Sequence, residues 1–179
     1  MLFRSAMVGR HNVYNSLAAI AAGFAEGLTP TEIHAGLMNL EATKMRFECQ
    51  KVKEWQVVND AYNASPMSMT AAINTLSDLT KDRKIAVMGD MLELGSVSES
   101  AHRRVGQELA EHQFAAVITR GVMGNFIAAG AKTGGVPVVE SCSSHEEAAA
   151  KLHEILQPGD TILFKGSRGM QMEKVIDLL

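Results

Sequence analysis

Two segments carry side chains suited to binding a nucleotide. Asn12 and Asn15 are three residues apart in an expected helix, so their amides share one helix face. Each amide offers a hydrogen-bond donor and an acceptor, as the edge of an adenine base does. Asp60 follows an expected strand, where a carboxylate can accept hydrogen bonds from both hydroxyls of a ribose. Tyr62 and Asn63 come next and are placed to face the phosphates of a nucleotide. The alternatives are a capped, polar helix face for the asparagines and a simple helix-entry turn after the strand.

Two other segments carry charges suited to an acceptor substrate. Lys165, Ser167 and Arg168 stand at a strand end before an expected helix, where backbone N–H groups and the helix dipole attract an anion. Arg168 can bind a carboxylate or a phosphate through two hydrogen bonds. Asp90 and Glu93 lie in a loop bounded by glycines and are suited to bind an amine or to steer a closure. For both loops the alternative is a solvated connection without a ligand.

The elements that must position these residues follow from hydrophobic periodicity. From residue 46 onward, short apolar runs alternate with helical patterns, which predicts an α/β fold with a mainly parallel sheet covered by helices on both faces. Polar residues, Asp60, Asp90, Arg120 and Lys165, follow four of the strands, at the edge where ligands bind in open α/β sheets. The expected strands are 47–52, 55–58 (the two paired as a ribbon), 84–88, 114–118, 136–139 and 161–164, and the expected helices are 68–79, 99–112, 125–132, 144–156 and one from 170.

The first 44 residues have a different, purely helical pattern. A helix is expected over 11–27, and the next begins at Thr29, which forms a capping box with Glu32. A capping box is also expected at 96–99, and Ser144 with Glu147 is expected to cap the helix over 144–156. Because two helices cannot bury their apolar faces alone, we expect this segment to be the end of another domain.

Composition narrows the classes of function. The chain has 179 residues, enough for one ordinary domain and a remainder, and a net charge of −3 without a long basic run, which argues against nucleic acid as a partner. No apolar run reaches the ~20 residues that span a bilayer, so a cytoplasmic protein without membrane insertion is expected. Cys49 and Cys142 are expected to be small core hydrophobes, and the six histidines show no metal-ligand spacing.

Several common catalytic motifs are missing from the sequence. The chain contains no G-x-x-x-x-G-K-[ST] phosphate loop and no G-x-G-x-x-G dinucleotide fingerprint. It also contains no G-x-S-x-G nucleophile elbow. Any chemistry is therefore expected to be shared with residues outside this chain or to be of a less familiar kind.

Four segments together resemble the Mur ligase family. In chain order they are G-R-H-N-V-Y-N-S-L-A-A, N-D-A-Y-N-A-S-P-M-S-M, V-M-G-D-M-L-E-L-G and L-F-K-G-S-R-G-M-Q-M-E. The first is similar to a segment shared widely in the family. The other three resemble the branch that adds D-alanyl-D-alanine to UDP-N-acetylmuramoyl-tripeptide in peptidoglycan precursor synthesis.

The resemblance implies a parent enzyme of three domains. Residues 1–44 would be the end of its central ATP-binding domain, and residues 45–179 its carboxyl-terminal, Rossmann-like ligase domain. ATP and Mg²⁺ would be bound mainly by the rest of the parent, which would also carry a modified lysine. The fragment alone would hold no complete catalytic site and is expected to be inactive.

The resemblance also implies a role for individual residues and a reaction. ATP would phosphorylate the tripeptide carboxylate, and the amine of D-alanyl-D-alanine would attack the acyl phosphate. An alternative is a stand-alone α/β module that binds a nucleotide or anion without catalysis, and the missing glycine fingerprint disfavours a nicotinamide-dependent oxidoreductase. The expected ATP contacts are Asn12, Asn15, Arg46, Asp60, Tyr62 and Asn63, and the expected substrate contacts are Lys165, Ser167 and Arg168, together with Asp90 from the loop argument above.

Overall fold

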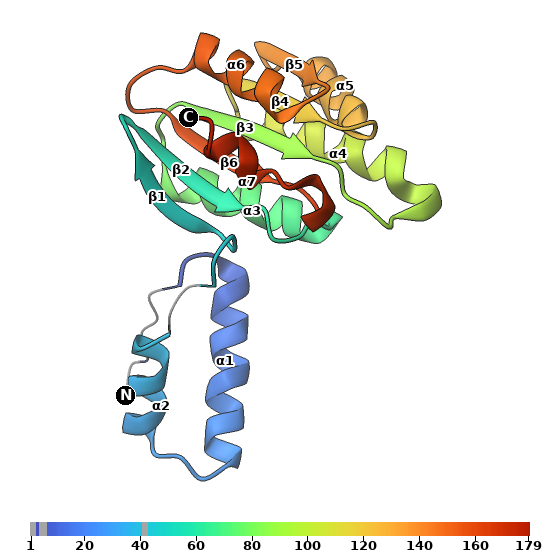
Figure 1. Ribbon diagram of the computed structural model, residues 1–179. Coiled ribbons are helices and arrows are strands. Elements are labelled where there is room, and N and C mark those ends of the chain that lie inside the picture. Colours follow the sequence, from blue (N-terminus) through green and yellow to red (C-terminus); the bar gives the residue numbers. More distant parts are fainter. Residues whose placement is uncertain (1–2, 4–6, 41–42) are drawn as a thin grey trace. The chain divides into compact units, whose positions relative to one another are not determined.

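The computed structural model describes residue 3, residues 7–40 and residues 43–179, which form two compact units. The first unit comprises residues 1–43 and the second residues 44–179. The division falls one residue before the domain boundary expected from the sequence. Both units are drawn in Figure 1.

The first unit is a pair of helices, α1 (Arg10–Ala25) and α2 (Pro30–Met38). The expected capping box forms at the start of α2: the Thr29 side chain accepts a hydrogen bond from the Glu32 backbone N–H, and the Glu32 carboxylate accepts one from the Thr29 N–H. Helix α1 ends two residues earlier than expected, because Gly27 takes a left-handed conformation and the Leu28 N–H bonds back to the Gly23 carbonyl.

The second unit is built on a six-stranded sheet, as the sequence predicts. Its strand order is β1-β2-β6-β3-β4-β5, and only the β1–β2 pair is antiparallel. The antiparallel pair is the ribbon expected at the start of this unit. The strands are β1 (Glu48–Val52), β2 (Trp55–Asp60), β3 (Lys84–Gly89), β4 (Ala116–Arg120), β5 (Val138–Cys142) and β6 (Thr161–Lys165).

Helices cover both faces of this sheet (Figure 1). Helices α6 and α7 pack with the buried cluster that includes Val57, Ile85 and Ile162. The strand residues next to these, such as Val58 and Leu163, are also buried, and strand geometry points them to the opposite face, where α3, α4 and α5 pack together. The helices are α3 (Pro66–Leu79), α4 (Ser98–Glu111), α5 (Gly124–Gly134), α6 (His145–Ile155) and α7 (Glu173–Ile176), with 3₁₀ turns at Gly95–Val97 and Arg168–Met170.

Two strands begin two residues later than expected, because an apolar residue closes the helix before each strand. The Phe114 N–H bonds to the Leu109 carbonyl, and the Val136 N–H bonds to the Ala131 carbonyl. In both cases the preceding residue has a positive φ, as in a Schellman ending. Phe114 and Val136 are buried as the apolar partners of these helix ends, not as strand residues.

Other local expectations differ in outcome. Ser144 caps α6 by accepting from the Glu147 N–H, as predicted. The capping box expected at 96–99 is wrong, because Ser96 lies in a 3₁₀ turn that runs directly into α4. The helix expected from residue 170 begins only at Glu173, after a left-handed residue at Gln171.

The two cysteines lie in different environments. Cys142 is buried at the end of β5, as expected for a core residue, whereas Cys49 is exposed on the edge strand β1. The prediction that Cys49 is a core hydrophobe is therefore wrong, because Cys49, Gln50 and Lys51 in the middle of this edge strand are all exposed. Within the described part of the chain, no helix is long and apolar enough to cross a membrane.

Candidate functional site

The polar strand ends of the second unit lie along one edge of the sheet. In the parallel register, Asp60 of β2 is opposite Lys165 of β6, and Gly89 of β3 is opposite Arg120 of β4. This edge is formed by the carboxyl ends of the parallel strands, where ligands bind in folds of this class. The structure thus brings together side chains that are more than 100 residues apart in sequence.

The centre of this edge is an ion pair between Asp60 and Lys165. The Lys165 Nζ lies 2.6 Å from Asp60 Oδ2, and it also donates to the Asn63 carbonyl at 3.1 Å and the Asp60 carbonyl at 3.4 Å. The other carboxylate oxygen, Asp60 Oδ1, accepts a 3.0 Å hydrogen bond from the Phe47 N–H. The Lys165 side chain is only 2% exposed and the Asp60 side chain 15% exposed.

Burial sets the electrostatics of this pair. Desolvation lowers the pKa of Lys165, the nearby Asp60 carboxylate acts to raise it, and the Arg46 charge acts to lower it further. The Asp60 carboxylate is therefore the main group that stabilises the ammonium form of the buried Lys165. Removing either partner would leave the other one buried without a counter-charge.

A short segment before β1 folds over the end of β2. Arg46 places its guanidinium 4.4 Å from the centre of the Tyr62 ring, in cation–π contact. The Tyr62 N–H donates to the Met45 carbonyl, and both Met45 and Phe47 have a positive φ. The expected nucleotide residues Arg46, Asp60, Tyr62 and Asn63 therefore lie together at one strand end.

The loop after β6 is tied to the loop after β3. Ser167 Oγ accepts a 2.9 Å hydrogen bond from the Leu92 N–H, and the Ser167 N–H donates to the Asp90 carbonyl. Arg168 pairs with Glu173 at 2.7 Å and remains half exposed. Of the expected substrate residues, Ser167 is thus buried and already hydrogen-bonded, while Arg168 can still reach a ligand.

Asp90 is turned into the protein. It is buried, and its Oδ1 accepts a 2.7 Å hydrogen bond from the Gly124 N–H at the first turn of α5. A Cβ on Gly121 would overlap the Asp90 carboxylate, so only glycine fits this close approach. Asp90 therefore caps α5 from a neighbouring strand end, which does not favour the amine-binding role expected from the sequence.

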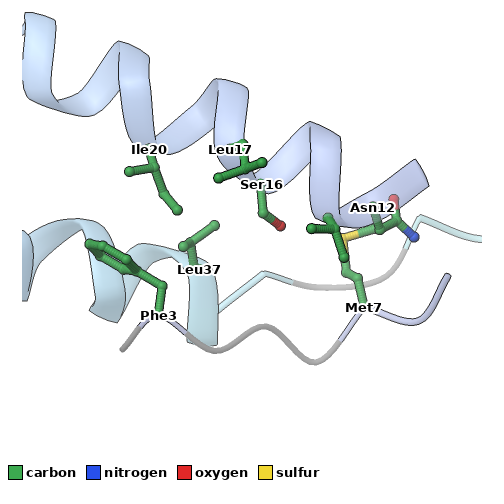
Figure 2. Close-up of a pocket in the computed structure, with 8 residues that line it drawn as sticks. Phe3, Met7, Asn12, Ser16, Leu17, Ile20 and Leu37 are labelled. Carbon is green, nitrogen blue, oxygen red and sulfur yellow. The ribbon is translucent and has the colours of Figure 1, made fainter. Parts of the chain in front are cut away.

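The two asparagines lie in the first unit and hydrogen-bond to each other. Asn15 Nδ2 donates to Asn12 Oδ1 at 3.1 Å, and Asn12 Nδ2 donates to the Val8 carbonyl at 2.8 Å. Asn12 is buried, whereas Asn15 is exposed. Figure 2 shows Asn12 and Leu17 among the residues that line a mainly apolar pocket of about 230 Å³ in this unit.

Residues 45–168 match the family model described as Mur ligase, glutamate ligase domain. The chain belongs to the Mur ligase family. It is 40% identical to the UDP-N-acetylmuramoyl-tripeptide–D-alanyl-D-alanine ligase of Bacillus subtilis, over 95% of this chain and 38% of that protein. Its fold is similar to a crystal structure of MurF from Acinetobacter baumannii, with a TM-score of 0.88, 32% identity, and coverage of 98% of this chain and 39% of that one.

A second similar structure contains a bound nucleotide. It is MurF ligase from Thermotoga maritima in complex with ADP, with a TM-score of 0.81, 26% identity, and coverage of 95% of this chain and 38% of that one. The chain spans a little over a third of the length of the curated Mur ligase relatives it matches, 38% and 37% for those of Bacillus subtilis and Escherichia coli.

Among the buried polar residues of this Mur ligase domain that sequence reasoning missed, His102 supports the loop after β3. His102 of α4 is fully buried; its Nε2 accepts from the Met91 N–H at 2.8 Å, and its Nδ1 lies 2.7 Å from the Ser98 carbonyl. These contacts correspond to a neutral imidazole protonated on Nδ1. Nothing in the local pattern around His102 indicates a contact with a loop 11 residues earlier, so only the fold reveals it.

The described part of the chain contains no cluster of potential metal ligands. Among residues 3, 7–40 and 43–179, no three His, Cys, Asp or Glu side chains come together as ligands.

Proposed function

We propose that this chain is the carboxyl-terminal part of an ATP-dependent ligase that adds D-alanyl-D-alanine to UDP-N-acetylmuramoyl-tripeptide. The printed names of its relatives in Bacillus subtilis and Escherichia coli, at 40% and 36% identity, support this reaction. In this proposal residues 1–43 complete an ATP-binding domain and residues 44–179 are the closing ligase domain.

The observation that carries the proposal is the arrangement at the end of β2. An acidic side chain with both oxygens held in place stands beside an arginine stacked on a tyrosine. A carboxylate held in this way can accept hydrogen bonds from the hydroxyls of a ribose. The guanidinium is suited to donate hydrogen bonds to a phosphate. We assign Asp60 to the ribose, Arg46 to the phosphates, and Asn12 and Asn15 to the adenine side.

The reaction proceeds in two steps. The tripeptide carboxylate attacks the γ-phosphorus of ATP. This step forms an acyl phosphate and releases ADP. The amine of D-alanyl-D-alanine then attacks the acyl carbon, the tetrahedral intermediate loses inorganic phosphate and a proton, and the new amide remains. The residues of this chain contribute mainly by positioning the nucleotide and by placing positive charge near its phosphates.

The test uses the longer protein that carries this chain. Incubation with UDP-N-acetylmuramoyl-tripeptide, D-alanyl-D-alanine, ATP and Mg²⁺ should yield the pentapeptide product with one ADP and one phosphate per ligation. Omission of any one substrate should stop product formation. ATP binding without any product, with all substrates present, would contradict the ligase and favour a nucleotide-binding module.

The 179-residue chain alone should bind ATP weakly, because its sequence contains no phosphate loop. Isothermal titration calorimetry is expected to give a dissociation constant well above the micromolar range. A sub-micromolar dissociation constant would show that the chain holds a complete nucleotide site by itself.

A further inference from the structure

Lys165 has no hydrogen-bonding capacity left for a substrate. An ammonium group has three N–H donors. In Lys165 they face Asp60 Oδ2, the Asn63 carbonyl and the Asp60 carbonyl, and the side chain is almost completely covered. Because all three N–H donors already face acceptors within the protein, none is left for a direct contact with the acceptor dipeptide.

The same contacts fix the carboxylate that we assign to the ribose. Lys165 holds Asp60 Oδ2, and the Phe47 N–H holds Oδ1, so each oxygen has one partner inside the protein. Each carboxylate oxygen has a second lone pair, and the Asp60 side chain still reaches solvent. The carboxylate is thus held in one orientation with one acceptor position free on each oxygen.

Lys165 also shapes the turn that follows Asp60. Its bond to the Asn63 carbonyl closes the segment that carries Tyr62, on which Arg46 stacks. Asn59 Oδ1 accepts a hydrogen bond from the Ala61 N–H and holds the start of the same turn. One lysine therefore links the carboxylate, the aromatic ring and the stacked arginine.

We propose that Lys165 is a positioning residue that orients Asp60 toward the ribose hydroxyls of ATP, and that it does not contact D-alanyl-D-alanine. The proposal rests on the function proposed above, because it takes Asp60 as the ribose-binding acid. It replaces the substrate-binding role expected for Lys165 from the sequence.

The first experiment separates the two substrates by steady-state kinetics of the longer protein. Lys165→Met should raise the KM for ATP about tenfold or more, since a hydrogen bond to a charged group is lost and Asp60 is released. The KM for D-alanyl-D-alanine should change less than about twofold. A raised KM for the dipeptide with an unchanged KM for ATP would overturn the proposal.

The second experiment reads the orientation of Asp60 directly. The wild-type enzyme should use ATP better than 2′-deoxyATP and 3′-deoxyATP, because a site that binds a hydroxyl rejects the analogue without it. In Lys165→Met this preference should fall toward one. A variant that is only less stable would keep the wild-type preference, and that result would contradict the positioning role.

The third experiment tests whether Lys165 acts through Asp60. The double variant Asp60→Asn/Lys165→Met should have the same KM for ATP as Asp60→Asn alone, because residues that act through one contact are not additive. Additive effects would mean that Lys165 acts elsewhere. Lys84→Met is the matched control: Lys84 is also a buried lysine, but it begins β3 at the opposite edge of the sheet, so its KM values should stay unchanged.

The measurements distinguish a wrong ligase reaction from a wrong positioning role for Lys165. A wild-type protein with no ligation activity would contradict the proposed reaction. The ATP and deoxyATP affinities of the same variants, measured by calorimetry, would then decide the role of Lys165 alone.

Discussion

At the scale of single residues, burial decides what a charged side chain is free to do. Lys165, Ser167 and Asp90 each stand at a strand end, and their residue types suit a substrate. In the structure all three are buried and hydrogen-bonded to other parts of the protein. Buried polar groups require such partners, so these three side chains shape the carboxyl-terminal edge of the sheet through contacts within the protein.

The cysteines give a prediction at this scale. Burial raises the pKa of Cys142 to about 11, with Glu147 and Glu140 adding to the effect. At pH 8 its thiol is therefore almost entirely protonated, and the thiolate is the reactive form. Labelling of the native chain with Ellman's reagent should show one fast thiol, Cys49, and a second thiol that reacts at least about tenfold more slowly.

Denaturant should make both thiols react at the same fast rate. Cys49→Ser should remove the fast phase, and Cys142→Ser should remove the slow one. Two fast thiols in the native chain would contradict the burial of Cys142.

At the scale of elements, the closest packing is between α4 and α5. A Cβ on Gly106 would overlap the Ile127 carbonyl oxygen, and one on Gly130 would overlap the Arg103 carbonyl oxygen. The two helix backbones therefore touch where they cross, and each supplies a glycine at the contact. Helix α5 is also the helix that Asp90 caps, so this crossing supports the loop after β3.

Gly106→Ala should destabilise the second unit by about 1–3 kcal/mol, because backbone atoms cannot move aside as a side chain can. Urea unfolding followed by the fluorescence of Trp55, the only tryptophan, measures this change. Gly36→Ala is the control, since a Cβ at that position in α2 meets no atom within 4 Å and lies in the other unit. An unchanged unfolding midpoint for Gly106→Ala would show that the helices are not in backbone contact.

At the scale of the whole molecule, the two units differ in how much core they contain. The second unit has a continuous core on both faces of its sheet. In the two helices of the first unit, the buried hydrophobic residues are Ile33 and Leu37, while Val13, Tyr14 and Leu17 are about half exposed or more. Two short helices with so little buried surface do not overcome the entropy of folding.

Residues 44–179 should therefore fold when expressed without residues 1–43. Their circular dichroism should show one cooperative thermal transition. Its midpoint temperature should be close to that of the transition followed by Trp55 fluorescence in the full chain. A peptide of residues 1–43 should be largely unfolded in water. Loss of cooperative unfolding in residues 44–179 would mean that the first unit is part of the same folding unit.

The candidate site could be predicted only in part from the sequence. Strand ends at Asp60 and Lys165 follow from local patterns, and a parallel sheet places such ends at one edge. Which strands are neighbours is not a local property: β6 lies between β2 and β3 although it comes last in the chain. The contact of His102 with the Met91 N–H depends on the path of a loop, and no periodicity encodes it.

By itself the sequence determined the α/β class, the helix caps at Thr29 and Ser144, and the residue types along the ligand edge. These depend on contacts between residues a few positions apart, which the order of amino acids specifies directly. Only the tertiary structure decided which charges are free: Lys165 and Asp90 turn inward, while Arg168 stays half exposed. The reason is that burial and hydrogen-bond partners come from segments far apart in the chain, brought together when the sheet forms.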